Sequence, residues 1–258
     1  MLSAFITVSI VGLFTFIGGF LALFTRSNNT KFLSIILGFS AGAMVYVSLS
    51  ELLNESQTLL LQELLKPEVI WIKVLAFLLG IMFVAIINHI IPLHVAGKTK
   101  LMMRISKRKQ IYKTGLLTLL ITFLHGLPIG LAIFFGSLIN MNCVGISVAI
   151  AAAVHNIPKG MFVAVPMYHA TNSNKKALFY TFISSIVELS GAILGLLFLN
   201  VLLTEIVLGV LFIIVAGMML YIAIDELLPI SRCNEDGHLS MVGFVTGIVV
   251  IVMICCKF

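Results

Sequence analysis

Eight segments of this chain are apolar over a length that can cross the roughly 30 Å hydrocarbon core of a bilayer. They lie near residues 3–24, 32–53, 70–91, 114–138, 144–167, 177–200, 205–228 and 239–256. The composition favours a lipid environment, because 60% of the residues are hydrophobic and only 10% are charged. Such a chain cannot cover its surface with polar groups. We therefore predict an all-α, polytopic integral membrane protein with eight transmembrane helices, in which residues 1–258 form a single transmembrane domain.

Lysine and arginine residues predict the orientation of these segments. Twelve of the sixteen lie in connections that follow the odd-numbered segments, most of them in the loop at about 92–113. Cytoplasmic loops of membrane proteins carry such an excess of Lys and Arg. We therefore expect a multi-pass protein of the cell membrane, with loop 92–113 in the cytoplasm and both termini outside.

Two neighbouring apolar segments contain the same six-residue pattern, His-x-x-Pro-x-Gly. The copies read HGLPIG at 125–130 and HNIPKG at 155–160. A proline within a helix removes one backbone hydrogen bond and exposes a carbonyl group. A histidine in the preceding turn adds a polar side chain where polar groups are costly. We predict that the two copies share one polar site.

A second repeat relates the second and the seventh apolar segments. Residues 41–53 read AGAMVYVSLSELL and residues 216–228 read AGMMLYIAIDELL, with seven of thirteen positions identical. In the predicted topology these copies run in opposite directions, as do the two His-x-x-Pro-x-Gly helices. Inverted repeats are typical of transporters, where they place the substrate site near the midplane. We expect inverted internal repeats around a central helix pair, with chance similarity between apolar helices as the alternative.

Missing signatures exclude several classes of protein. The sequence contains neither a nucleotide-binding loop nor a dinucleotide-binding fingerprint. The four cysteines include no Cys-x-x-Cys pair, so the sequence indicates no disulfide framework and no thiolate zinc site. We expect a transporter that uses no cofactor, is not an enzyme and has no nucleic-acid partner.

Several motifs together resemble a known family. The two His-x-x-Pro-x-Gly helices, the segment SIVELSGA at 185–192 and the patterns A-G-x-M-x-Y and D-E-L-L-P are similar to the ZIP (Zrt/Irt-like) metal transporters, in particular to a bacterial ZupT-like branch. The resemblance extends over about residues 10–256. It implies uptake of a divalent metal ion into the cytoplasm, with zinc as the main substrate and iron or manganese as further ones. It is also consistent with a homodimer.

The resemblance implies roles for individual residues. In the family, the fourth and fifth helices carry H-N-x-P-E-G motifs whose glutamates complete a two-metal site, and the sixth helix supplies a further glutamate. By position, His125 and His155 match the ligand histidines. Asn156 matches the motif asparagine, and Glu188 matches the sixth-helix carboxylate. Met44 matches a methionine that lies near the site in some members.

This chain departs from the family pattern at three positions. Gly126 replaces the first asparagine, Ile129 the first glutamate and Lys159 the second glutamate. An ammonium group thus stands where a dication would bind, and their repulsion amounts to several kcal/mol even at an effective dielectric constant of about 20. We predict that the family's two-metal arrangement cannot form here.

The remaining residues can still bind one metal ion. Two neutral imidazoles, with Met44 and water, suffice for a single Zn²⁺. We expect Lys159 to pair with Glu188 and to balance the charge that a second metal would supply. Three alternatives stay open: the histidines hydrogen-bond across the helix pair, the Lys159–Glu188 pair is purely structural, and Met44 is ordinary packing. Met219, at the equivalent position of the repeat, favours the last of these.

Acidic residues near the ends of two segments are candidates for the metal pathway. Asp225 and Glu226 lie at the predicted inner end of the seventh segment, where they would receive metal at the exit. Glu51 lies at the predicted outer end of the second segment, where it would attract cations to the entrance. Solvation at a water interface explains all three equally well.

Two other classes of function are alternatives to metal transport. A membrane enzyme would combine an intramembrane Lys or Ser with a His, but no G-x-S-x-G motif occurs. The second class is a ZIP-like membrane protein with impaired transport and a sensing or regulatory role, which the lost motif glutamates favour.

Overall fold

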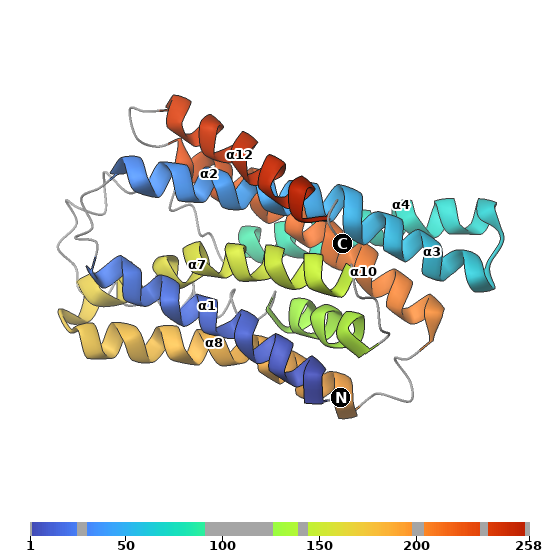
Figure 1. The fold of residues 1–258 in the computed structure, drawn as a ribbon, viewed down its shortest axis with the longest axis horizontal. Helices are drawn as coiled ribbons and strands as arrows, with labels where there is room; N and C mark the ends of the chain where they lie inside the picture. The colour runs from blue at the N-terminus through green and yellow to red at the C-terminus, as the bar shows by residue number, and fades with distance from the viewer. Residues whose placement is uncertain are drawn as a thin grey trace.

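In the computed structural model, every regular element of the described residues is a helix (Figure 1). The structure describes residues 2–24, 30–90, 126–138, 144–197, 204–232 and 237–255. The α-helices are α1 (Leu2–Phe24), α2 (Thr30–Tyr46), α3 (Leu53–Glu63), α4 (Lys66–Ile90), α7 (Val144–Thr171), α8 (Asn174–Leu197), α10 (Glu205–Tyr221), α11 (Leu228–Ser231) and α12 (Gly237–Cys255). A further helix without a label spans Gly126–Leu138. Two π-helices, η1 (Val47–Leu52) and η2 (Ile222–Leu227), continue α2 and α10.

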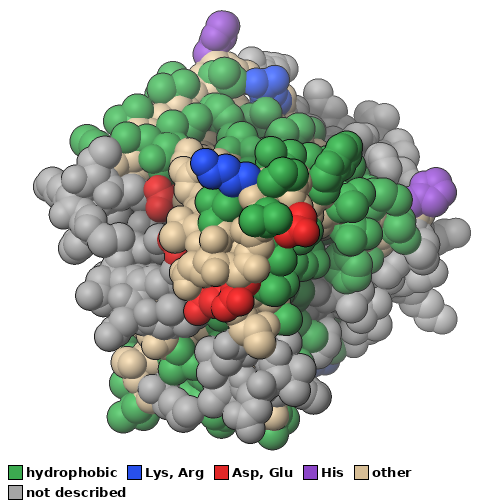
Figure 2. All heavy atoms as spheres, turned by 90° about the vertical axis from the view of Figure 1, so that its right-hand side faces the viewer, with side chains coloured by type: hydrophobic (Ala, Val, Ile, Leu, Met, Phe, Trp, Pro, Cys, Tyr) green, Lys and Arg blue, Asp and Glu red, His purple; other side chains and the backbone are tan. Residues whose placement is uncertain are grey.

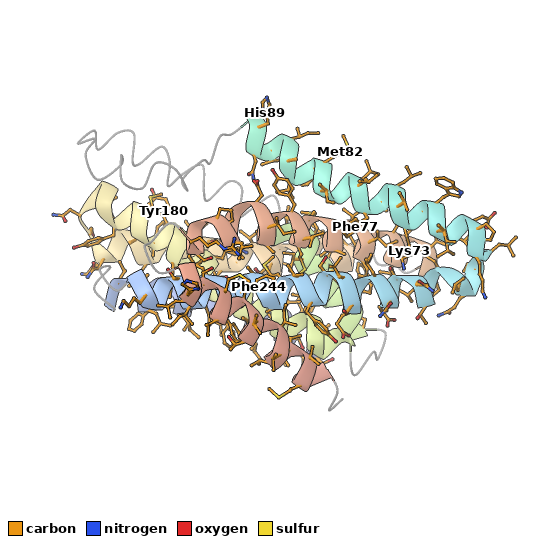
Figure 3. The ribbon with its side chains drawn as sticks, turned by 90° about the horizontal axis from the view of Figure 1, so that it is seen from above. Lys73, Phe77, Met82, His89, Tyr180 and Phe244 are labelled. Carbon is orange, nitrogen blue, oxygen red and sulfur yellow. The ribbon has the colours of Figure 1, made fainter. Side chains whose placement is uncertain are left out.

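These helices confirm the predicted polytopic membrane fold. Five are long and apolar enough to cross a bilayer, namely Leu2–Leu23, Ser34–Glu63, Lys66–His89, Asn174–Leu197 and Glu205–Asp225. Gly126–Leu138 and Gly237–Met253 are shorter apolar helices. Apolar side chains of α4, such as Trp71 and Met82, are exposed, as a lipid-facing helix requires. Figure 3 shows Met82 on the outer side of α4. The start of the fourth predicted segment and the basic loop 92–113 lie outside the described residues.

The second helix is longer than the sequence predicts. The predicted segment ends near residue 53, whereas the chain stays helical through η1 and α3 to Glu63. The reason is tertiary packing, because Leu59 and Leu60 of α3 are buried. A Cβ atom added at Gly209 of α10 would lie 2.8 Å from Cγ of Leu60. Packing against the start of α10 therefore stabilises the end of this helix, although the sequence there is polar.

The helices form two closely packed groups. One group contains α2, α4, α10 and α12, in which α2 lies along α12 and α4 along α10. The other contains α1, α7, α8 and the Gly126–Leu138 helix, in which α1 lies against both α7 and α8 (Figure 1). Glycines let the backbones touch within each group, as in other membrane helix pairs. The described residues of the predicted polar site lie in the second group.

Equivalent contacts show that the first group is built from an inverted repeat. A Cβ atom at Gly42 of α2 would collide with the carbonyl oxygen of Phe244, and a Cβ atom at Gly217 of α10 would collide with that of Phe77. Gly42 and Gly217 occupy the same position of the thirteen-residue repeat. The copies run in opposite directions, because η1 packs against α10 and η2 against α2. These contacts agree with the predicted repeat, because equivalent glycines face equivalent neighbouring helices.

The second group follows the same symmetry. A Cβ atom at Gly130 would collide with the carbonyl oxygen of Glu188 on α8, and one at Gly160 with the carbonyl oxygen of Thr15 on α1. Gly130 and Gly160 end the two His-x-x-Pro-x-Gly copies. Thr15 is therefore the structural counterpart of Glu188.

The π-helices are a feature that the sequence does not predict. η1 and η2 cover the same positions of the two repeat copies, so the symmetry extends to this departure from α-helical geometry. Ser48 of η1 donates a hydrogen bond to the carbonyl oxygen of Ala216 at 2.7 Å, which ties one repeat to the other. Single π-turns occur mostly within α-helices and often at functional sites. Glu51 and Asp225 both lie on these turns.

Candidate metal-binding site

The second His-x-x-Pro-x-Gly copy lies in the middle of α7, which continues through Pro158 without a break. Proline has no N–H group, so the carbonyl four residues earlier, that of Val154, loses its helical partner. Ser40 of α2 supplies the missing donor, with its Oγ 3.2 Å from the Val154 oxygen. The exposed carbonyl predicted from the motif is therefore satisfied by a neighbouring helix.

A buried ion pair joins α7 to α8. Nζ of Lys159 lies 2.7 Å from Oε1 of Glu188, and their side chains are 3% and 0% exposed. The ion pair expected from the sequence is therefore present. The ammonium group occupies the position that the family pattern gives to a carboxylate ligand.

The other carboxylate oxygen of Glu188 is also engaged. Nδ2 of Asn156 donates to Oε2 of Glu188 at 2.8 Å and to the carbonyl oxygen of Val11 at 2.9 Å. The amide nitrogen thus has both hydrogens engaged, which leaves the amide oxygen, Oδ1, as the atom through which Asn156 can coordinate a cation. This network links α1, α7 and α8.

Small residues make room for this network. A Cβ atom at Gly126 would lie 3.4 Å from Nζ of Lys159 and 2.9 Å from Cγ1 of Val187. A Cβ atom at Gly12 of α1 would lie 3.7 Å from Oε2 of Glu188. The lysine head thus fills space beside Gly126, where the family motif has an asparagine side chain. The two departures from the motif fit each other.

The surroundings of the pair carry little other polarity. Among the buried residues that the structure describes, Lys159 and Glu188 are the only charged ones. Ile129, the third departure from the motif, is 3% exposed and belongs to the main hydrophobic core. The hydroxyl of Thr15 on α1 is buried without a hydrogen-bond partner. The formal charges of Lys159 and Glu188 cancel, so the described part of the site is neutral.

The structure places some of the other predicted residues and leaves some undescribed. Met44 is fully buried in the main hydrophobic core. His155 lies on α7 directly before Asn156, but the structure describes only its backbone. His125 lies outside the described residues. Within the part of the chain that is described, no three His, Cys, Asp or Glu side chains form a metal-binding cluster. The predicted ligand set therefore remains a prediction.

The predicted entrance and exit residues lie on the two π-turns. Glu51 of η1 is half-buried, Asp225 of η2 is exposed, and the backbone of Glu226 lies on the same turn as Asp225. Beyond Glu51, α3 and the start of α4 carry the acidic residues Glu55, Glu63 and Glu68 at one end of the molecule. Figure 2 shows acidic side chains on this face. Their roles on a metal pathway stay predictions.

Sequence reasoning missed two partners of the site. The Val11 carbonyl orients Asn156, and the Ser40 hydroxyl satisfies Val154. Neither lies in a motif, since one is a backbone group and the other a common residue in a helix. The internal symmetry is the one feature that could have indicated these partners. It makes α1 the counterpart of α8, so α1 is expected to pack beside the same helices as α8.

Comparison with known proteins identifies relatives over almost the whole chain. Residues 93–255 match the family described as ZIP Zinc transporter. The zinc transporter ZupT of Streptococcus mutans is 38% identical over 97% of this chain and 95% of its own length. The proteins of the same description from Akkermansia muciniphila and Clostridium perfringens are 39% and 36% identical, over 98% and 97% of this chain and over 97% and 94% of their own lengths.

Proposed function

This chain belongs to the ZIP zinc transporter family, and we propose that it carries zinc into the cytoplasm through a site that holds one metal ion. The names of its relatives support zinc as the substrate. Iron and manganese are further candidate substrates, since imidazole and amide ligands do not by themselves select one divalent ion.

The position of Lys159 is the observation that carries the one-metal proposal. Its ammonium nitrogen lies 2.7 Å from the Glu188 carboxylate, so a second dication at this carboxylate would meet a positive charge at close range. Repulsion between such charges is large in a low-dielectric interior. Zinc is then held by His125, His155 and the Asn156 oxygen, with Met44 as a further candidate ligand.

The distribution of charge supports a direction of transport. The Lys-rich and Arg-rich connections favour both termini outside and loop 92–113 inside. The acidic end of the molecule then faces outward, and Glu51 lies where it attracts cations to the entrance. Asp225 and Glu226 lie at the opposite, cytoplasmic end, where they receive zinc at the exit. We also propose a homodimer, which a mass measurement in detergent by light scattering tests.

Zinc uptake into proteoliposomes tests the proposed function. Wild-type protein is expected to transport zinc, and His155→Ala is expected to abolish that uptake. His89→Ala is the matched control, because His89 is exposed at the end of α4. Equal uptake by wild type and His155→Ala would rule out His155 as a ligand.

A sensing or regulatory role is the second candidate. It is favoured because Lys159, in its ion pair with Glu188, stands where the family motif has a metal ligand. The same experiment separates the two functions. Zinc binding by the wild-type protein without any zinc flux would favour the sensor, whereas flux that depends on His155 supports the transporter.

A further inference from the structure

We propose that Lys159 is a tethered counter-cation, which keeps the binding site neutral whenever the carrier is empty. This inference rests on the proposed transport function and concerns the step after zinc has left. In that step the empty site must become accessible from the outside again. A buried carboxylate otherwise needs a cation from solution while the empty site returns to the outside. The lysine would take the place of that cation.

Two opposite charges are buried among the described residues. Glu188 is the one buried acid there, and Lys159 is the one buried base. They contact each other at 2.7 Å. The elements packed around them add no described charge, since α1 presents Gly12 and Thr15 and the Gly126–Leu138 helix presents Gly126.

Groups of the protein itself hold both carboxylate oxygens of Glu188. Asn156 fixes the second carboxylate oxygen of Glu188 and is itself held by the Val11 carbonyl. The space beside Gly126 accommodates the ammonium group. Each oxygen of the carboxylate therefore has a partner within the protein, and one of these partners carries the compensating positive charge.

The inverted repeats connect this pair to a transport cycle. Such repeats let a protein expose one central site alternately to the two sides of the membrane. Burying an unpaired charge costs far more than burying a paired one. During the return of the empty carrier, a site with Glu188 alone would bury an uncompensated negative charge. A site with the Lys159–Glu188 pair buries no net charge.

Two modes of zinc movement separate the empty step from the loaded step. Net uptake into zinc-free liposomes requires the empty carrier to return. Exchange of labelled for unlabelled zinc, with zinc on both sides, requires only the loaded carrier. The ratio of net uptake to exchange therefore reports the empty step and is not changed by a loss of folded protein.

Lys159→Met is expected to lower this ratio by about tenfold or more, because it leaves Glu188 unpaired in the empty site. Lys159→Arg keeps the positive charge and is expected to lower the ratio less than Lys159→Met does. The double variant Lys159→Met/Glu188→Gln removes both charges and is expected to restore the ratio, even where its absolute rates are low. An unchanged ratio in Lys159→Met would overturn the inference.

A measurement on the wild-type protein tests the same inference without any substitution. Net zinc uptake is expected to stay the same when Na⁺ and K⁺ on the inside are replaced by choline. A requirement for one of these ions inside would show that a dissolved cation accompanies the return, and would contradict a tethered one. Absence of both uptake and exchange in the wild type would instead refute the proposed transport function.

Discussion

The ammonium nitrogen of Lys159 lies 2.7 Å from a carboxylate oxygen of Glu188, and both side chains are shielded from solvent. This contact joins α7 to α8 in the interior of the helix group that holds both His-x-x-Pro-x-Gly copies. Asn156 holds the other carboxylate oxygen at 2.8 Å. The pair is thus a buried structural contact between two helices as well as a part of the proposed metal site.

Removing one partner of this pair should destabilise the protein strongly. Glu188→Leu leaves a buried ammonium group without a counter-charge, which costs about 3–5 kcal/mol. The double variant Lys159→Met/Glu188→Leu should recover most of that loss, because no charge remains buried. Unfolding in detergent without zinc measures both. Additive losses in the double variant would show that the two residues do not interact.

Reversing the charge at position 159 should favour metal binding. Lys159→Glu places a second carboxylate beside Glu188, so zinc affinity should rise even where the transport rate does not. Titration calorimetry of the purified protein measures the dissociation constant. An unchanged constant would contradict the position of Lys159 beside the metal site.

A side chain at position 126 should disturb the lysine. A Cβ atom there would lie 2.9 Å from Val187 and 3.4 Å from Nζ of Lys159. We expect Gly126→Ala to lower the stability by about 1–3 kcal/mol, the usual effect of overpacking, and by less in a Lys159→Met background. Gly237→Ala is the control, since nothing lies within 4 Å of its added Cβ atom. An equal loss from Gly126→Ala in the wild-type and Lys159→Met backgrounds would assign the effect to Val187 alone and count against the close approach of Lys159.

The hydroxyl group that replaces the donor lost at Pro158 should contribute measurably to stability. Ser40→Ala removes the bond to the Val154 oxygen and leaves a buried carbonyl unpaired, at a cost of about 1–3 kcal/mol. Ser9→Ala removes an exposed bond within α1 and should have little effect. Chemical unfolding in detergent compares the two variants, and equal stability would show that the Val154 oxygen finds another donor.

The helices and the repeat were predictable from the sequence, because they depend on local hydropathy and on similarity between segments. The Lys159–Glu188 pair was predictable because a buried charge in a membrane requires a partner, and Glu188 is the acid that the sixth apolar segment supplies. These predictions needed no knowledge of how the helices cross.

Other features depend on contacts between distant helices and could not be predicted. The π-turns η1 and η2 contain residues that fit an α-helix equally well. The extension of α2 through η1 and α3 to Glu63 depends on packing against α10. The sequence of this segment does not predict that packing, because it is polar. The bonds from Asn156 to Val11 and from Ser40 to Val154 link helices whose relative positions the sequence pattern does not specify.

The number of zinc ions bound by each chain tests the central claim most directly. Purified protein dialysed against zinc should retain one ion per chain, measured by elemental analysis together with protein mass. His155→Ala should retain almost none, while His89→Ala should match the wild type. Two zinc ions per wild-type chain, both lost in His155→Ala, would contradict a site in which Lys159 takes the place of the second metal.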